Sequence, residues 1–219
     1  MTKENTVTPF AAVLAVIVSF LLLLFVGGAL ALLLGYGLAL ILSELLIIVV
    51  PLTYMLSKHV DVRSYIGLEV KPGTILRGVA LGGALLLFDI VVTSVLTPIL
   101  GTSQAAEESN RIITDLGGSP VGLLSVAIGL SLAGVCEEFT FRAFLQNTIN
   151  RKYSFLPALV VSSAAWGLFH FDPQMIYFVY AFLSGLVLGY IYHRWNSYVT
   201  TAITHATYNL IVLAILMLA

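Results

Sequence analysis

The chain has 219 residues, of which 59% are hydrophobic and only 10% are charged. This composition is typical of a membrane protein and leaves no long polar stretch for a separate soluble domain. A formal net charge of −1, with scattered Lys and Arg residues, provides no basic face, so nucleic-acid binding is a poor hypothesis. The single cysteine, Cys136, excludes an intrachain disulfide and a Cys-rich metal site.

Seven stretches of the chain are apolar over the length of about 20 residues that a helix needs to cross a bilayer. The first is much longer than the core of a signal peptide, which has roughly 7 to 15 residues. Turn-forming groups rich in Gly, Pro and Asn separate the stretches. The sequence therefore predicts an all-α, polytopic transmembrane bundle in one integral membrane domain, residues 1–219. The expected spans are 9–33, 36–56, 74–100, 120–147, 155–171, 174–193 and 198–218.

The distribution of cations predicts the orientation of the bundle. Only Arg111, in the acidic loop 101–120, falls outside if the N-terminus is inside, and Arg142 lies within a span. Because short cytoplasmic loops are enriched in Lys and Arg, we expect a multi-pass protein of the cell membrane with its N-terminus inside and its C-terminus outside. The cations on the expected inner side are Lys3, Lys58, Arg63, Lys71, Arg77, Arg151, Lys152 and Arg194.

Polar residues that could carry chemistry cluster on three of the expected spans. Each ionisable residue costs about 2.5 to 3.5 kcal/mol on insertion into a membrane, so such residues usually mark a functional cavity. These residues occur together on helices that otherwise carry almost no charge. We therefore favour one functional site over separate structural roles for each residue. The cluster consists of Glu137, Glu138 and Arg142 on the fourth span, His170 at the end of the fifth, and His205 and Asn209 on the seventh.

Helical spacing separates the roles of the two glutamates. Glu138 and Arg142 are four residues apart and share a helix face, so they can form an ion pair. Glu137 is rotated by about 100° and is left without that partner. Glu137 and His170 each lie about 16 residues from the expected turn between the fourth and fifth spans, which predicts a similar depth in the membrane. His205 and Asn209 also share a face and could polarise a carbonyl oxygen.

Structural roles remain open for these residues. Glu138 and Arg142 could form only a buried ion pair, and His205 with Asn209 could tie helices together by hydrogen bonds. Two further carboxylates, Glu44 and Asp89, are isolated on the second and third spans, and we place both outside the candidate site. Cys136 is best interpreted as a small packing residue.

At this point the sequence resembles the CAAX prenyl endopeptidases and their prokaryotic relatives, often called Abi or CPBP proteins. That family carries EExxxR, FxxxH and HxxxN or HxxxD motifs, in that order, on successive membrane helices. Tryptophan replaces the usual phenylalanine of the second motif, which leaves only the fine shape of the pocket in doubt. The resemblance covers roughly residues 120–218, which we expect to form the catalytic core. The three motifs read Glu137-Glu138-Phe-Thr-Phe-Arg142, Trp166-Gly-Leu-Phe-His170 and His205-Ala-Thr-Tyr-Asn209.

The resemblance implies an intramembrane, glutamate-dependent endopeptidase that acts on a peptide or protein substrate in the lipid bilayer. Glu137 with His170 would activate a water molecule, and His205 with Asn209 would stabilise the oxyanion. Glu138 and Arg142 would hold the first glutamate in place and contact the substrate. No cofactor is expected.

Three other interpretations use the same residues differently. A zinc-dependent membrane metalloprotease could use Glu137, His170 and His205 as ligands, although the sequence has no HExxH motif. A non-catalytic membrane immunity or scaffold protein could bind a peptide without cutting it. A transporter could use Glu137 and His170 as a proton relay, but the paired repeats or broken helices expected of one are not visible.

Overall fold

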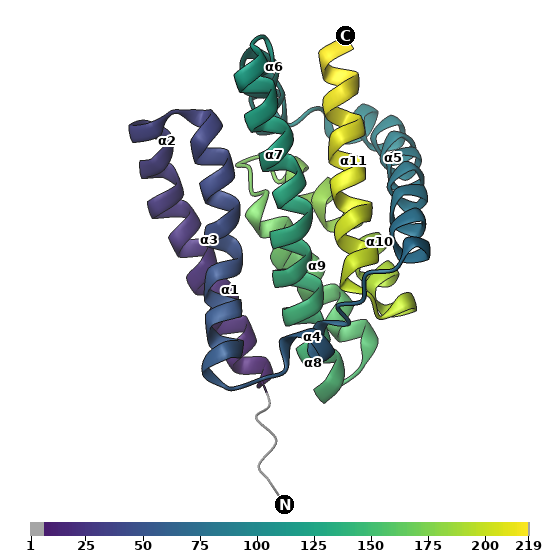
Figure 1. Ribbon diagram of the computed structural model, residues 1–219. Coiled ribbons are helices and arrows are strands. Elements are labelled where there is room, and N and C mark those ends of the chain that lie inside the picture. Colours follow the sequence, from purple (N-terminus) through teal and green to yellow (C-terminus); the bar gives the residue numbers. More distant parts are fainter. Residues whose placement is uncertain (1–6, 219) are drawn as a thin grey trace, which may run out of the picture.

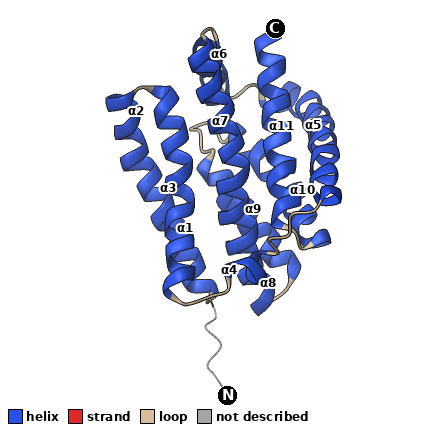
Figure 2. Ribbon diagram, viewed as in Figure 1, coloured by secondary structure: helices blue, strands red, loops and turns tan. Residues whose placement is uncertain are grey.

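The described part of the chain, residues 7–218, is built from helices, and the computed structural model contains no strand within it (Figure 2). Two stretches, η1 and η2, are π-helical, so their backbone hydrogen bonds span five residues instead of four. The elements in chain order are α1 Pro9–Leu22, η1 Leu23–Gly27, α2 Gly28–Leu34, α3 Tyr36–Ser57, α4 Val62–Ile66, α5 Pro72–Leu100, α6 Gln104–Gly117, α7 Pro120–Glu137, η2 Glu138–Gln146, α8 Asn147–Lys152, α9 Phe155–Phe169, α10 Ile176–Trp195 and α11 Tyr198–Leu218.

Six continuous helical segments of the described chain are long and apolar enough to cross a membrane. The fifth predicted span corresponds to α9, which has 15 residues and is shorter than the usual length of about 20. It ends at Phe169 because His170 leaves the helical conformation, and Asp172 precedes a proline, which disfavours helix. The predicted all-α polytopic bundle is confirmed, with six full-length candidate spans and one short apolar helix.

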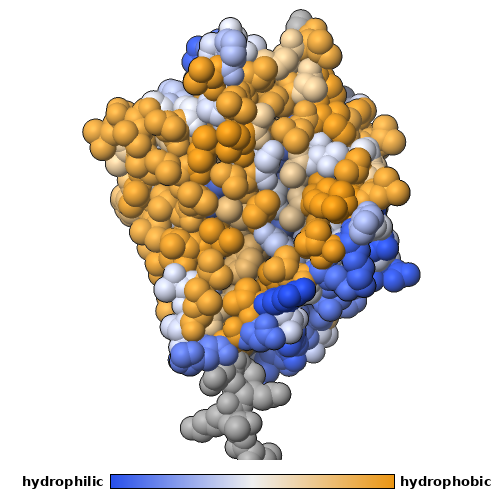
Figure 3. Space-filling view, viewed as in Figure 1, coloured by the Kyte–Doolittle hydropathy of each residue, from blue (hydrophilic) through white to orange (hydrophobic). Residues whose placement is uncertain are grey.

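Large apolar side chains cover the surface of the bundle between its two ends (Figure 3). Leu32 is 90% exposed and Val121 is 81% exposed. Such surface is unfavourable in water but matches the hydrocarbon interior of a bilayer, where the helices satisfy their own backbone hydrogen bonds. Hydrophilic surface lies mainly at the lower end in this view and over α6 at the upper end (Figure 3).

The acidic segment 101–120, expected to be a loop, contains the surface helix α6. Ser103 begins this helix, because its Oγ accepts a hydrogen bond from the backbone N–H of Ala106 at 3.2 Å. The same Oγ donates a hydrogen bond to Oδ2 of Asp172 at 2.7 Å. The start of α6 is thereby tied to the segment that follows α9.

Close helix packing brings the carboxyl-terminal helices together. In the centre of Figure 1, α11 lies beside α7, and α3 packs against α7 from the other side. A Cβ atom on Gly134 of α7 would lie only 2.6 Å from the backbone nitrogen of Ala206 on α11. Glycine at this position therefore allows α11 to approach, which places His205 beside the end of α7.

The short helices α4 and α8, which carry Arg63, Arg151 and Lys152, lie at the end of the bundle where α1 begins, whereas α6, which carries Arg111, lies at the other end (Figure 1). Arg151 of α8 donates a hydrogen bond to the carbonyl of Tyr65 in α4 at 3.2 Å, and the Arg77 guanidinium lies over the ring of Trp195. The end of α11 lies at the opposite end of the bundle, together with α6 (Figure 1). Lys3, one of the cations used to predict orientation, lies outside the described residues.

We expect the end of the chain to face the outside of the cell, because the cations gather at the end opposite to α6 and the end of α11. A reporter enzyme that works only outside the cytoplasm should therefore be active when it is fused after Ala219, a residue that itself lies outside the described residues. The same reporter inserted between α8 and α9, next to Lys152, should be inactive, because we expect this segment to lie in the cytoplasm. An inactive C-terminal fusion would contradict this topology.

Candidate active site

The site lies where the fourth span changes from α-helix to π-helix. Glu137 is the last residue of α7, and η2 begins with Glu138. All nine residues of η2 are buried. Stretches of π-helix are rare and are frequent at functional sites. The change of helix type therefore coincides with the pair of adjacent glutamates.

Glu138 forms the buried ion pair that its four-residue spacing from Arg142 predicts. Arg142 Nη1 lies 2.8 Å from Glu138 Oε1, and neither side chain is exposed. Arg142 Nη2 also donates a hydrogen bond of 3.4 Å to the carbonyl of Gly185 on α10, and the guanidinium lies 4.5 Å from the ring centre of Trp166. The charge of Glu138 is thus compensated within the protein.

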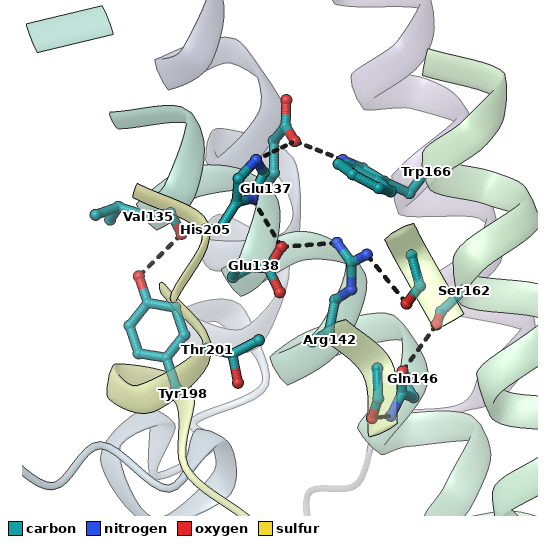
Figure 4. Close-up of polar contacts among 12 residues, drawn as sticks. Val135, Glu137, Glu138, Arg142, Gln146, Ser162, Trp166, Tyr198, Thr201 and His205 are labelled. Atoms are coloured by element: carbon teal, nitrogen blue, oxygen red, sulfur yellow. Dashed lines mark hydrogen bonds and ion pairs between the residues drawn. The ribbon is translucent and has the colours of Figure 1, made fainter. Parts of the chain in front are cut away.

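Glu137 has different partners from its neighbour (Figure 4). The indole N–H of Trp166 on α9 donates a hydrogen bond to Glu137 Oε2 at 2.5 Å. His205 Nε2 lies 4.0 Å from the same oxygen. Glu137 is 7% exposed and makes no ion pair with a Lys or Arg of the described chain. The two glutamates are therefore chemically distinct, since Arg142 forms an ion pair with Glu138 and not with Glu137.

His205 bridges the two glutamates (Figure 4). Its Nδ1 lies 2.9 Å from Glu138 Oε1, while its Nε2 points toward Glu137. A carboxylate can only accept, so Nδ1 carries the hydrogen of this bond when Glu138 is ionised. Trp166 packs edge-on against the imidazole, with the ring centres 5.5 Å apart. The orientation of His205 is thus set by partners on three different elements.

His170 lies one helical turn beyond Trp166, at the half-buried end of α9. Its Nδ1 is 3.1 Å from the carbonyl of Trp166, and its ring lies between those of Trp166 and Tyr177, at 4.9 and 5.1 Å. Since a carbonyl only accepts, Nδ1 carries the hydrogen, and Nε2 of the neutral ring is an acceptor. The structure does not bring His170 into hydrogen-bonding contact with Glu137, although both residues are described.

The π-helix explains why Trp166, rather than His170, reaches Glu137. Straight α-helices on both sides of the turn would place Glu137 and His170 at a similar depth. A π-helix has more residues in each turn and advances less per residue, so η2 brings Glu137 closer to the turn at Tyr153. The matching residue on α9 is then one turn earlier, at Trp166.

Asn209 fastens α11 to α7 one turn beyond His205. Its Nδ2 donates a hydrogen bond to the carbonyl of Leu130 at 3.1 Å, and the side chain is partly buried. An amide nitrogen has two hydrogens, so the second remains for another acceptor.

A comparison with models of known protein families found a match, which covers the helices that carry the site residues. Residues 119–211 match the model of the family described as type II CAAX prenyl endopeptidase Rce1-like. This segment, which is less than half of the chain, is therefore similar to the Rce1-like family. The predicted resemblance is thereby confirmed for this segment, and a membrane protease is the activity that the family implies. Searches among curated proteins and among solved structures found no match for the chain.

The Rce1-like segment comprises α7, η2, α8 to α10 and α11 up to residue 211, and it contains all seven motif residues. The helices from α1 to α6 lie outside it. Nevertheless α3 packs directly against α7 and η2, because the carbonyl of Ile47 accepts a hydrogen bond of 3.1 Å from Thr140. The first half of the chain therefore supports the site that the Rce1-like segment carries.

Two residues near Glu137 were not assigned to the site from the sequence. Trp166 was expected to affect only the shape of the pocket, but its indole N–H contacts Glu137 directly. Glu44 of α3 is 8% exposed, its Oε2 has no hydrogen-bond partner among the described residues, and it lies close enough to Glu137 for the two charges to interact. The only visible signal for Trp166 was its donor group, and the only signal for Glu44 was the presence of a carboxylate within a membrane span.

The zinc alternative can be compared with the geometry of its expected ligands. Within residues 7–218, no three His, Cys, Asp or Glu side chains gather closely enough to hold a metal ion. The nitrogen of His205 nearest to Glu137 is 4.0 Å away, and His170 bonds to a backbone carbonyl. Zinc ligands lie about 2.0 to 2.2 Å from the metal, so two ligands of one ion can lie up to about 4 Å apart. The distance between Glu137 and His205 therefore does not separate the two mechanisms, which differ in their response to removal of metal.

Proposed function

We propose that this protein is an intramembrane endopeptidase that hydrolyses a peptide bond of a membrane-associated peptide or protein with water activated by Glu137. One observation carries the proposal: Arg142 compensates the charge of Glu138, while adjacent Glu137 has no cationic partner of that kind. A carboxylate without a compensating cation is available to take a proton. The family match at residues 119–211 supports the same reaction class.

In the proposed first step, Glu137 takes a proton from a water molecule as the water oxygen attacks the carbonyl carbon of the scissile bond. General-base catalysis of this kind typically contributes about 10²- to 10⁴-fold. His170 presents Nε2 as an acceptor, so it can orient the same water by a second hydrogen bond. When the bond between carbon and nitrogen breaks, the proton on Glu137 passes to the leaving nitrogen.

The negative charge that develops on the carbonyl oxygen needs donors. We assign His205 to this role as an imidazolium that carries both protons: Glu138 accepts the hydrogen bond from Nδ1, and the N–H at Nε2, which points toward Glu137, is the donor for the oxyanion. Asn209, on the same face of α11, supplies its second amide hydrogen. Removal of one oxyanion donor typically costs about 10²- to 10³-fold in rate. Glu138 and Arg142 then act on catalysis through His205, because Glu138 sets the position of the imidazole.

This mechanism uses protein groups and water alone, and it makes a testable statement about metals. Purified protein in detergent should retain its peptidase activity after exhaustive chelation, and elemental analysis of the same sample should find no stoichiometric zinc. In a zinc mechanism the ion, not Glu137, would lower the pKa of the water to about 7. Complete loss of activity that one zinc ion per chain restores would reject the metal-free mechanism.

A further inference from the structure

Trp166 differs from the family pattern in one chemical property. The phenylalanine usual at this motif position has no polar atom, whereas the indole of tryptophan carries one N–H donor and no acceptor. In this chain the donor lies 2.5 Å from Glu137 Oε2. The substitution therefore adds a hydrogen bond to the glutamate that we propose as the base.

The indole of Trp166 is held firmly in place. The side chain is 5% exposed, with the Arg142 guanidinium over one face and the His205 ring against it. On the α10 side, a Cβ atom on Gly185 would lie only 3.1 Å from Trp166 Cε3. Because dense packing on several sides leaves little freedom for rotation, the N–H is fixed in direction.

The two oxygens of Glu137 consequently have different surroundings (Figure 4). Oε2 accepts the Trp166 hydrogen bond and also faces His205 Nε2 at 4.0 Å. Oε1 points away from both rings in Figure 4, and no hydrogen bond to it is found among the described residues. Oε1 is also not among the fully buried polar atoms without a partner.

We propose that Trp166 is a positioning residue that holds Glu137 by Oε2 and leaves Oε1 as the atom that takes the proton from water. This inference rests on the proposed function of Glu137, and it adds the residue that orients the base. A fixed carboxylate is an advantage because misplacing a catalytic group by about 1 Å can reduce the rate about a hundredfold.

The contact itself can be tested without activity, because the chain has two tryptophans, Trp166 and Trp195. Both rings lie beneath arginine guanidinium groups, but only Trp166 donates to a carboxylate. In ¹⁵N-indole-labelled protein, we expect Glu137→Ala to move one indole N–H resonance strongly upfield and to leave the other in place. Unchanged positions of both resonances would overturn the proposal. This measurement keeps Trp166 in place, so it does not depend on how a Trp166 variant folds.

The positioning role can be tested by kinetics with Trp166→Phe, which keeps an aromatic ring beneath Arg142 and removes the donor together with part of the ring volume. We expect kcat to fall about tenfold or more, with KM changed by less than about twofold, since the base is misplaced while substrate contacts remain. Trp195→Phe is the matched control and should leave both constants unchanged. Equal kcat values for the two variants would reject the positioning role.

The two measurements separate failure of this inference from failure of the proposed function. If Glu137→Gln retains full activity while the indole resonance still responds to Glu137→Ala, the contact exists but Glu137 is not the base. If Glu137→Gln is inactive and Trp166→Phe is fully active, Glu137 is the base but Trp166 does not position it.

Discussion

Replacing Glu137 by glutamine should abolish hydrolysis while leaving the fold intact. The amide is nearly isosteric and keeps an oxygen that can accept the Trp166 hydrogen bond, but it cannot take a proton from water. We expect activity to fall about 10²- to 10⁴-fold, the range typical of a lost general base. Activity on a peptide substrate and thermal unfolding should be measured on the same purified samples.

The control for this variant is Glu108→Gln, which makes the same chemical change in the exposed helix α6. It should have the activity of the parent protein. Retention of more than about a tenth of parental activity by Glu137→Gln would reject Glu137 as the base. A large fall in its melting temperature would instead indicate a structural role.

Replacing Arg142 by alanine should strongly destabilise the protein. The change removes the cation 2.8 Å from Glu138 and leaves that carboxylate buried with only His205 as a polar partner. Breaking a buried ion pair in this way typically costs about 3 to 5 kcal/mol. Unfolding in mixed micelles with increasing denaturing detergent would measure the loss. Activity should fall as well, because Glu138 also holds His205.

A double variant distinguishes the ion pair from simple loss of packing. If the unpaired charge is the cause, Glu138→Gln in the Arg142→Ala background should restore part of the stability, because it removes that charge. No gain over Arg142→Ala alone would mean that the charge of Glu138 is not responsible. Arg111→Ala, which breaks an exposed arginine–glutamate pair on α6, should have little effect.

The features that could be predicted from the sequence are those that depend on local spacing. Apolar length alone indicates where the chain crosses the bilayer, and all seven expected spans are helical in the structure. The ion pair of Glu138 and Arg142 follows from residues four apart on one helix. The expected separation of Glu137 from this pair follows from the same geometry, because adjacent residues point in different directions.

Contacts between helices could not be predicted in the same way. The π-helical stretch changes the register of Glu137 against α9, and no residue pattern in the sequence indicated it. As a result Trp166, and not His170, lies against Glu137. Glu44 comes from a helix outside the family segment, so neither spacing nor motif could place it within electrostatic range of Glu137. Such contacts depend on helix register and side-chain rotamers, which cannot be derived from the residue pattern of a single sequence.

Electrostatic contacts link Arg142, Glu138 and His205 into one network. A membrane interior disfavours every uncompensated charge, and the protein places one cation, Arg142, among Glu138, Trp166 and the Gly185 carbonyl. His205 then shares Glu138 with Arg142. This network fixes the imidazole beside Glu137, while Glu137 itself makes no ion pair with a Lys or Arg of the described chain, as we propose for the base.

If Glu137 drives cleavage of membrane-borne peptides, protein termini in membrane fractions should differ between cells with and without an active Glu137. Cells that produce the parent protein and cells that produce Glu137→Gln at the same level would be analysed by mass spectrometry of all peptide ends. We expect a set of new C-termini, within or next to apolar segments, that appears only with the parent protein. Identical sets of termini in the two membranes would contradict the account and favour a non-catalytic membrane protein.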